Sequence, residues 1–294
     1  MDTKELVIKK ENIFETFFLA WISFLATFKI CFKHIIIPII GQLFGILMIS
    51  LAPVLEYREM IDVTQTPDGW LYITLSILGT AIFIYFLWRF FVTLGGINLL
   101  ARDIYDDRAI ANLSFYISDI LRKKGGFIRF LIGYSFITGV FVLITAGILY
   151  LEQKIIVYNF LTNFAHLLIL LGLTTTVLTY LLFSNIALQG YTFNRILGFS
   201  RTIIRIKKFI KEHLLQLILL SLITVCFSNI ISYLVQAIIT FLIINPFDLT
   251  TENSLGAAIR FTGGVIINGF VVAFLQFVYA RFYLVSEQNS TRLF

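Results

Sequence analysis

The chain has 294 residues, of which 59% are hydrophobic, 16% aromatic and only 14% charged, and its mean hydropathy is +0.90. Soluble domains carry about 25% charged residues, so a chain this apolar cannot cover a water-facing surface with polar groups. The composition excludes an ordinary soluble enzyme, a disordered chain and a fibrous protein, and it indicates a polytopic membrane protein.

The N-terminal segment carries charges of both signs in residues 1–12 and shows no secretory signal. The first apolar run, residues 13–28, ends close to Lys29 and Lys33. We interpret it as a helix that is interfacial or shallowly embedded in the membrane. The alternative is that residues 13–32 form a seventh span, with the N-terminus outside.

Six longer apolar runs predict six membrane-spanning helices, because each crossing needs about 20 mainly apolar residues. These runs lie at residues 35–55, 71–97, 127–150, 162–188, 214–244 and 257–284. Short connections join the two members of each consecutive pair, and longer, more basic connections join one pair to the next. The expected fold is therefore all-α.

Positive charge is distributed unevenly around these spans. The net charge is +6, yet the short connections and the outer span ends hold only Arg58, Lys154 and Arg260, and Arg89 lies within a span. The remaining lysines and arginines lie on the other side. The positive-inside rule then places both termini in the cytoplasm. In this setting the basic charge predicts contact with anionic lipid headgroups and not with nucleic acid.

Three cytoplasmic stretches share one design, an amphipathic segment followed by basic residues and a span. They read ENIFETFFLAWISFLATFKICFKH, AIANLSFYISDILRKKGGF and NRILGFSRTIIRIKKFIKEH. The even-numbered spans also end alike, with Phe90, Leu182 and Phe274 opening comparable stretches. We therefore predict one membrane domain, residues 1–294, built from three two-span repeats at about 11–107, 108–193 and 194–288. A cytoplasmic interfacial helix precedes each repeat's first span.

The third amphipathic segment has the clearest two-sided pattern. Its large apolar residues, among them Ile203, Ile204 and Ile206, share one broad helical face, and Arg201 and Arg205 lie opposite. We interpret it as a membrane-surface helix; the alternative is a water-exposed linker helix. Its cations form a candidate collar for anionic lipid, called the basic collar below: Arg195, Arg201, Arg205, Lys207, Lys208 and Lys211.

The repeat, the GFSRTIIRIKKFIKEHLLQLILL segment and the closing AFLQFVYARFYLVSEQ resemble the YciC-type uncharacterised bacterial inner-membrane proteins. They are also similar to the membrane domain attached to some glycerophosphodiester phosphodiesterases. The resemblance covers most of the chain in layout, and it implies a six-span all-α inner-membrane protein. It carries over no catalytic residues, because this chain has no soluble barrel with a histidine and carboxylate constellation.

No arrangement of residues in the sequence predicts catalysis. The three histidines, His34, His166 and His213, lie in different places without ligand-spaced partners. There is no phosphate-binding loop with Lys and Ser or Thr. Every Asp lies in a loop, an interface or a terminus, which excludes a paired-aspartate intramembrane protease. We expect a protein that is not an enzyme and has no metal or cofactor.

Two features within the spans have competing interpretations. Arg89 either extends toward the headgroups or binds an anionic ligand. Polar residues recur every four positions in the fifth span, and they either hydrogen-bond to neighbouring helices or line a polar cavity. With polar residues of the even spans they form a candidate polar interior: Arg89, Asn185, Ser228, Asn229, Ser232, Gln236, Asn268 and Gln276.

Gly41 and Gly45 form a GxxxG pattern in the first span, which allows close approach of two helix backbones. We expect this approach within one chain and not in a dimer.

The leading functional hypothesis is an integral inner-membrane protein that acts in envelope or lipid homeostasis or as a membrane scaffold. The alternative is a transporter that moves a small or lipid-like molecule through a polar bundle interior.

Overall fold

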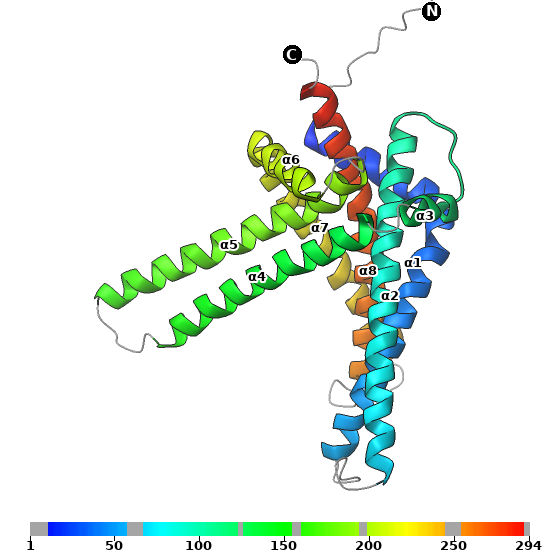
Figure 1. Ribbon diagram of the computed structural model, residues 1–294, viewed down its shortest axis with the longest axis vertical. Helices are drawn as coiled ribbons and strands as arrows, with labels where there is room; N and C mark the ends of the chain where they lie inside the picture. The colour runs from blue at the N-terminus through cyan, green and yellow to red at the C-terminus, as the bar shows by residue number, and fades with distance from the viewer. Residues whose placement is uncertain are drawn as a thin grey trace, which may run out of the picture. The chain divides into compact units, whose positions relative to one another are not determined.

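The computed structural model describes residues 11–57, 67–122, 126–154, 160–193, 199–244 and 254–290, and every regular element in these ranges is a helix. In chain order the helices are α1 (Ile13–Tyr57), α2 (Pro67–Tyr105), α3 (Leu113–Arg122), α4 (Gly126–Lys154), α5 (Phe160–Phe193), α6 (Phe199–Glu212), α7 (Leu214–Ile239), a short π-helix (Thr240–Ile244) and α8 (Ser254–Ser290) (Figure 1). The predicted all-α fold is confirmed.

Six helices among the described residues are long and apolar enough to cross a membrane, as predicted. The candidate spans are Ile13–Ser50, Ile73–Tyr105, Gly126–Tyr150, Leu168–Phe193, Leu214–Leu242 and Gly256–Gln288. Each contains most of one predicted span. The fold therefore has the layout of a multi-pass membrane protein.

The first amphipathic segment is continuous with the first span. We expected a separate helix before residue 35, but α1 runs unbroken through 45 residues. At about 1.5 Å per residue this is roughly 68 Å, more than twice the hydrocarbon thickness of a bilayer. By contrast, α6 and α7 are separate helices that meet at a turn at His213. The placement of residues 13–32 in or on the membrane stays a prediction.

The chain divides into two compact units. Unit 1 comprises Met1–Ile13, Asp119–Ile223 and Tyr279–Phe294, and unit 2 comprises Phe14–Ser118 and Thr224–Val278. These boundaries do not follow the three predicted repeats. The expected single domain of residues 1–294 stays a prediction.

The core of unit 2 follows one face of α1. Its buried residues recur every three or four positions, which is the period of a helix face: Thr16, Ala20, Phe24, Thr27, Cys31, Ile35 and Ile39. Beside this face, Phe274 of α8 makes edge-to-face ring contacts with Phe17 and Trp21, whose centroids lie 5.4 and 5.1 Å away. Phe227 of α7 joins the same cluster, with its ring centroid 5.2 Å from that of Phe274. Ring contacts therefore hold the start of α1 against α7 and α8.

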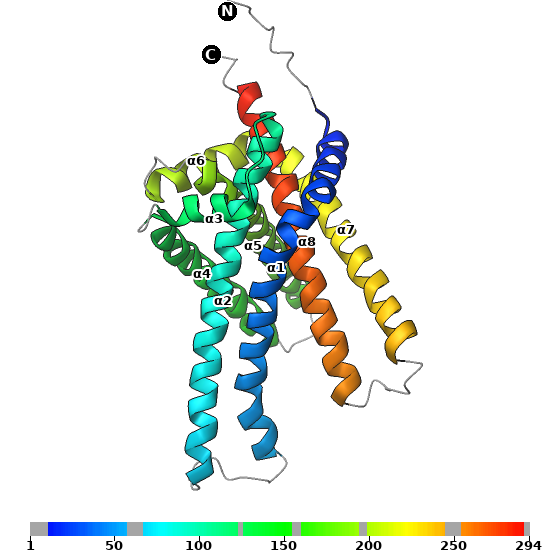
Figure 2. The same ribbon diagram turned by 90° about the vertical axis from the view of Figure 1, so that its right-hand side faces the viewer.

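Glycines bring α1 and α2 together farther along unit 2. A Cβ atom on Gly45 would lie 2.8 Å from both the carbonyl oxygen of Gly79 and the backbone nitrogen of Phe83. A Cβ atom on Gly41 would overlap the ring of Phe86. The two helices run side by side, blue and cyan in Figures 1 and 2. The prediction that the GxxxG pattern packs within one chain is confirmed.

Unit 1 contains the α4–α5 hairpin and α6. The two long helices lie side by side, green in Figure 1, and the ring of Phe130 on α4 stacks on Tyr191 of α5 at 4.5 Å. The α6 helix contacts α5 at Gly190, which is covered by Ile206. A Cβ atom added to Gly190 would lie 2.5 Å from the Ile206 Cγ1. Phe209 of α6 stacks on Tyr283 of α8, also at 4.5 Å. The α6 helix is therefore held by packing against protein on one side.

Candidate functional site

The basic collar lies on α6, except for Arg195, which is outside the described residues. Arg201, Lys207 and Lys211 are exposed, and none has a carboxylate partner among the described residues. Lys208 lies 3.7 Å from Glu212, one turn later on the same exposed surface. Exposed pairs of this kind contribute little to stability, so Lys208 also keeps most of its attraction for other anions.

Arg205 differs from the other cations of the basic collar. Its Nε and Nη2 donate to Oε1 of Glu287 on α8, at 3.1 and 2.6 Å, and the Tyr283 hydroxyl donates to the same oxygen at 2.9 Å. Partial burial opposes the charge of Arg205, but the ion pair outweighs it and raises the pKa of the guanidinium. Arg205 therefore fastens α6 to α8, a role that the sequence pattern did not reveal.

The apolar face of α6 is shared between protein and surroundings. Ile206 is fully buried against Gly190, although we had placed it on the face toward the membrane. Phe209 and Thr202 are also buried. Ile204 is 67% exposed and is free to contact lipid. The sequence pattern identified the amphipathic helix, but it could not distinguish a face that contacts protein from one that contacts lipid.

Within unit 2, the members of the candidate polar interior make separate local contacts. Ser232 of α7 donates to Oδ1 of Asn268 on α8, at 3.1 Å, and this is one pair in unit 2. Gln236 is exposed near Gly264, and Asn229 and Asn268 are exposed as well. The Ser228 hydroxyl donates to its own helix at the carbonyl of Thr224, at 2.7 Å, and Gln276 is half-buried. Most of these side chains therefore act locally.

Asn185 belongs to a different cluster, in unit 1. Its Nδ2 donates to the Tyr279 hydroxyl at 2.8 Å and lies 3.4 Å from the Ser221 Oγ, which is 3.3 Å from the same tyrosine oxygen. These three side chains come from α5, α8 and α7. The sequence analysis missed Ser221 and Tyr279, because a lone Ser or Tyr in an apolar run gives no signal. The cluster hydrogen-bonds three helices together, as polar residues in membranes commonly do.

Arg89 is half-buried on α2, beside the turn of α1 that contains His34. The Thr93 hydroxyl lies within hydrogen-bond distance of two carbonyl oxygens, that of Arg89 at 2.9 Å and that of His34 at 3.4 Å. Among the described residues no carboxylate forms an ion pair with Arg89.

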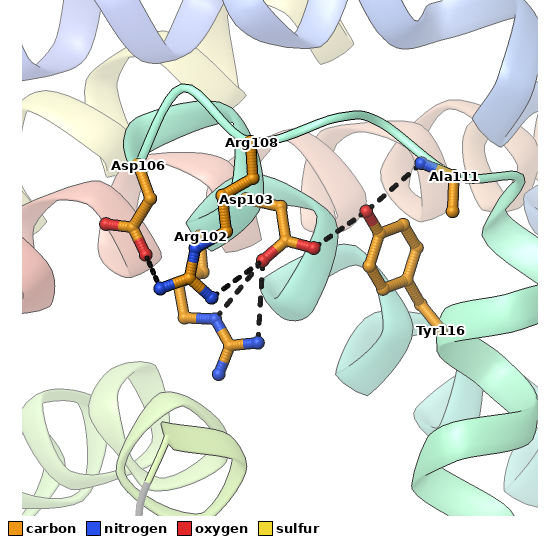
Figure 3. Close-up of polar contacts among 6 residues, drawn as sticks. All are labelled: Arg102, Asp103, Asp106, Arg108, Ala111 and Tyr116. Atoms are coloured by element: carbon orange, nitrogen blue, oxygen red, sulfur yellow. Dashed lines mark hydrogen bonds and ion pairs between the residues drawn. The ribbon is translucent and has the colours of Figure 1, made fainter.

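A polar network that the sequence analysis did not identify shapes the connection between α2 and α3 (Figure 3). The Ala111 amide donates to the Tyr116 hydroxyl at 3.3 Å, and that hydroxyl donates to Oδ2 of Asp103 at 2.9 Å. Oδ1 of Asp103 lies 3.5 Å from Arg102 and 3.8 Å from Arg108. Burial raises the pKa of Tyr116, so the phenol keeps its donor proton at neutral pH.

The arrangement offers no metal centre: no cluster of three or more His, Cys, Asp or Glu side chains suited to a metal ion occurs in the part of the chain that the structure describes.

Comparisons with known proteins assign the chain to no family. No family model, no curated protein and no solved structure matches the chain. The resemblance to YciC-type proteins therefore stays a prediction. What the fold defines is a class, namely an all-helical protein with six helices able to span a membrane.

Proposed function

We propose that this chain is an integral protein of the bacterial inner membrane that acts as a scaffold for anionic lipid, without enzymatic activity. The observation that carries the proposal is α6, which is packed against protein through Ile206 and Phe209 while Arg201, Lys207 and Lys211 stay exposed. A helix held in this way presents a fixed row of positive charge. Each cation near an anionic surface contributes roughly 1 kcal/mol, so three of them supply about 3 kcal/mol of lipid attraction.

Similar packing after successive even spans supports the proposed repeats. After α2, Ile117 of α3 covers Gly96, whose Cβ atom would lie 3.0 Å from the isoleucine Cγ1. After α5, Ile206 of α6 covers Gly190 in the same manner. The third even span, α8, has the first amphipathic segment against it through the rings around Phe274. We infer that each amphipathic segment lies at the cytoplasmic interface.

The transporter alternative has less support. A continuous polar route would need Arg89, Asn185 and the stripe of α7 to face one water-filled space. The bonds from Asn185 to Tyr279 and from Ser232 to Asn268 instead link neighbouring helices, which favours the role of these side chains in packing.

The proposed topology predicts where reporters will be found. A reporter fused after Phe294, or inserted at Lys124 or Lys208, is expected to read cytoplasmic, because basic residues flank these positions. A reporter inserted at Thr251 is expected to read external. Fusions of alkaline phosphatase and of green fluorescent protein give opposite signals on the two sides. An external signal at Lys208 would overturn the six-span topology.

The lipid-scaffold proposal predicts salt-sensitive protection of one side chain of α6. In vesicles containing anionic lipid, Ile204→Cys is expected to react slowly with a soluble maleimide. Replacing Arg201, Lys207 and Lys211 with Gln should speed this reaction at least several-fold, because the electrostatic attraction is lost. High salt should do the same to the parent protein by screening.

The buried neighbour supplies the control for this measurement. Ile206→Cys should react slowly in both backgrounds, because protein and not lipid covers it. If Ile204→Cys reacts rapidly even in the parent protein, α6 does not lie on the membrane and the scaffold proposal is wrong. Slow reaction in both backgrounds would instead mean that the cations do not hold α6 to lipid.

A further inference from the structure

A cavity of about 360 Å³ opens in unit 2 between α1 and the connection from α2 to α3. Lys29, Lys33 and His34 line it from α1, and residues 110–112 line it from the opposite side. Both lysines are exposed, and neither has a carboxylate partner among the described residues. The cavity therefore concentrates positive charge that no carboxylate of the described residues neutralises.

The wall opposite the lysines is held in place. The network of Figure 3 ties the amide of Ala111 through Tyr116 to Asp103, and Asp106 pairs with Arg108 at 3.1 Å. The same contacts engage Asp103 and Asp106 with arginines of their own segment. These two carboxylates are thus already compensated, and they compete little for the lysines across the cavity.

The N-terminus of α3 adds partial positive charge at the same place. Asn112 lines the cavity and caps the helix, since its Oδ1 accepts from the amide of Ser114 at 3.3 Å. The Ser114 hydroxyl lies 3.3 Å from Nε2 of His34. A helix N-terminus favours anions. Two lysines and this helix end therefore surround one cavity.

An apolar groove lies farther along α1. A second cavity of about 730 Å³ lies between α1 and α8 and is lined by Ile40, Phe44 and Leu47, together with residues of α8 between 258 and 266. On α1, Lys33, Ile40, Phe44 and Leu47 share one helical face. At 1.5 Å per residue, this face is about 21 Å long from Lys33 to Leu47. That length exceeds the roughly 15 Å thickness of the hydrocarbon in one leaflet.

We propose that the basic cavity binds the phosphate of an anionic phospholipid headgroup while an acyl chain of that lipid lies in the apolar groove below. The chemistry of the basic cavity alone would also suit a soluble phosphate. The groove on the same helix face favours the lipid, because a free phosphate has nothing to place there. The inference rests on the proposed function only for the direction of α1 in the membrane, since the basic collar belongs to unit 1 and this cavity to unit 2.

The reactivity of the lysine amines tests the proposal in the full-length protein. Nanodiscs of phosphatidylcholine, with or without phosphatidylglycerol, contain no competing lipid amine, so an amine reagent followed by mass spectrometry reports each lysine. Phosphatidylglycerol is expected to slow labelling of Lys29 and Lys33 by more than about fivefold, the factor expected from a merely adjacent anionic surface. Lys207 and Lys211, exposed on α6, should slow by no more than that factor.

A third sample, phosphatidylcholine nanodiscs with inorganic phosphate, separates the two sources of the anion. Protection by inorganic phosphate and not by phosphatidylglycerol would overturn the lipid assignment. Equal protection of all four lysines would mean that surface charge alone explains the effect, and it would overturn the proposed site. The absence of protection at Lys29 and Lys33 would also overturn the proposed site. Lys207 and Lys211 are measured in the same samples. A basic collar that does not respond to phosphatidylglycerol is therefore detected independently of the result at Lys29 and Lys33.

A variant that fills the cavity gives an independent test without changing any charge. Ala111→Phe places a ring in the cavity lining and should restore the labelling of Lys29 and Lys33 in phosphatidylglycerol nanodiscs. Ala109→Phe is the matched control, because it makes the same change at an exposed residue outside the lining. Thermal stability in detergent checks that both variants fold. Continued protection in a folded Ala111→Phe protein would overturn the proposal.

Discussion

Replacing Glu11 with Gln is expected to destabilise unit 1 by about 3 kcal/mol, because it removes the carboxylate charge that pairs with the largely buried Arg281. The Arg281 guanidinium donates to Glu11 through Nε at 2.8 Å and Nη2 at 2.6 Å, one bond to each carboxylate oxygen. The side chains are only 12% and 5% exposed. This two-point geometry is the strongest form of an arginine–carboxylate contact. It joins the chain just before α1 to the last turns of α8.

The measurement is thermal unfolding of the full-length protein in detergent, with the fraction that stays monodisperse as the readout. Glu212→Gln is the matched control: its partner Lys208 lies 3.7 Å away, both side chains are well exposed, and the expected loss is below about 1 kcal/mol. Salt should leave the difference between the two variants nearly unchanged, because a buried pair is poorly screened. Equal stability of the two variants would contradict the structural role given to Glu11.

The sequence predicted the helices well and their tertiary partners poorly. Runs of about 20 apolar residues identify membrane spans without knowledge of their neighbours, because the length of a run is set by the bilayer and not by packing. The break expected before residue 35 is absent: Lys29 and Lys33 are good helix formers, and α1 accommodates even Pro38, a residue type that disfavours a helix interior. Glycine pairs do not mark helix ends reliably either, because Gly95 and Gly96 lie within α2, and Gly263 and Gly264 lie within α8.

Candidate site residues were harder to predict, because their roles depend on partners far away in the chain. Arg205 looked like one more exposed cation, but its partner is Glu287, 82 residues later. The Asn98 side chain is fully buried, and neither polar atom of its amide finds a hydrogen-bond partner among the described residues. Nothing around Asn98 in the sequence distinguishes it from the exposed Asn229. A polar stripe in a span thus predicts contact with something polar, but not whether that contact is within the helix, between helices or with lipid.

Substituting Gly45 with Leu tests a close backbone contact between α1 and α2 in unit 2. Any side chain at this position meets backbone atoms of Gly79 and Phe83, and backbone cannot rotate away as a flexible side chain can. Overpacking costs typically 1–3 kcal/mol and occasionally more, and we expect about 3 kcal/mol or more here. Gly139→Leu is the matched control: Gly139 lies in α4, and beyond the local backbone of its own helix nothing lies within 4 Å of its Cβ position, so the same change should have little effect on stability.

Thermal stability and oligomeric state, measured together, separate the two meanings of the GxxxG pattern. If Gly41 and Gly45 pack α1 on α2 within one chain, Gly45→Leu lowers the melting temperature, and Gly79→Leu does the same from the other side of the contact. If the pattern instead joined two chains, Gly45→Leu would abolish a dimer while leaving the melting temperature of the monomer unchanged. The second outcome would contradict the packing seen here, because a Cβ atom at Gly45 cannot be accommodated without moving the α2 backbone.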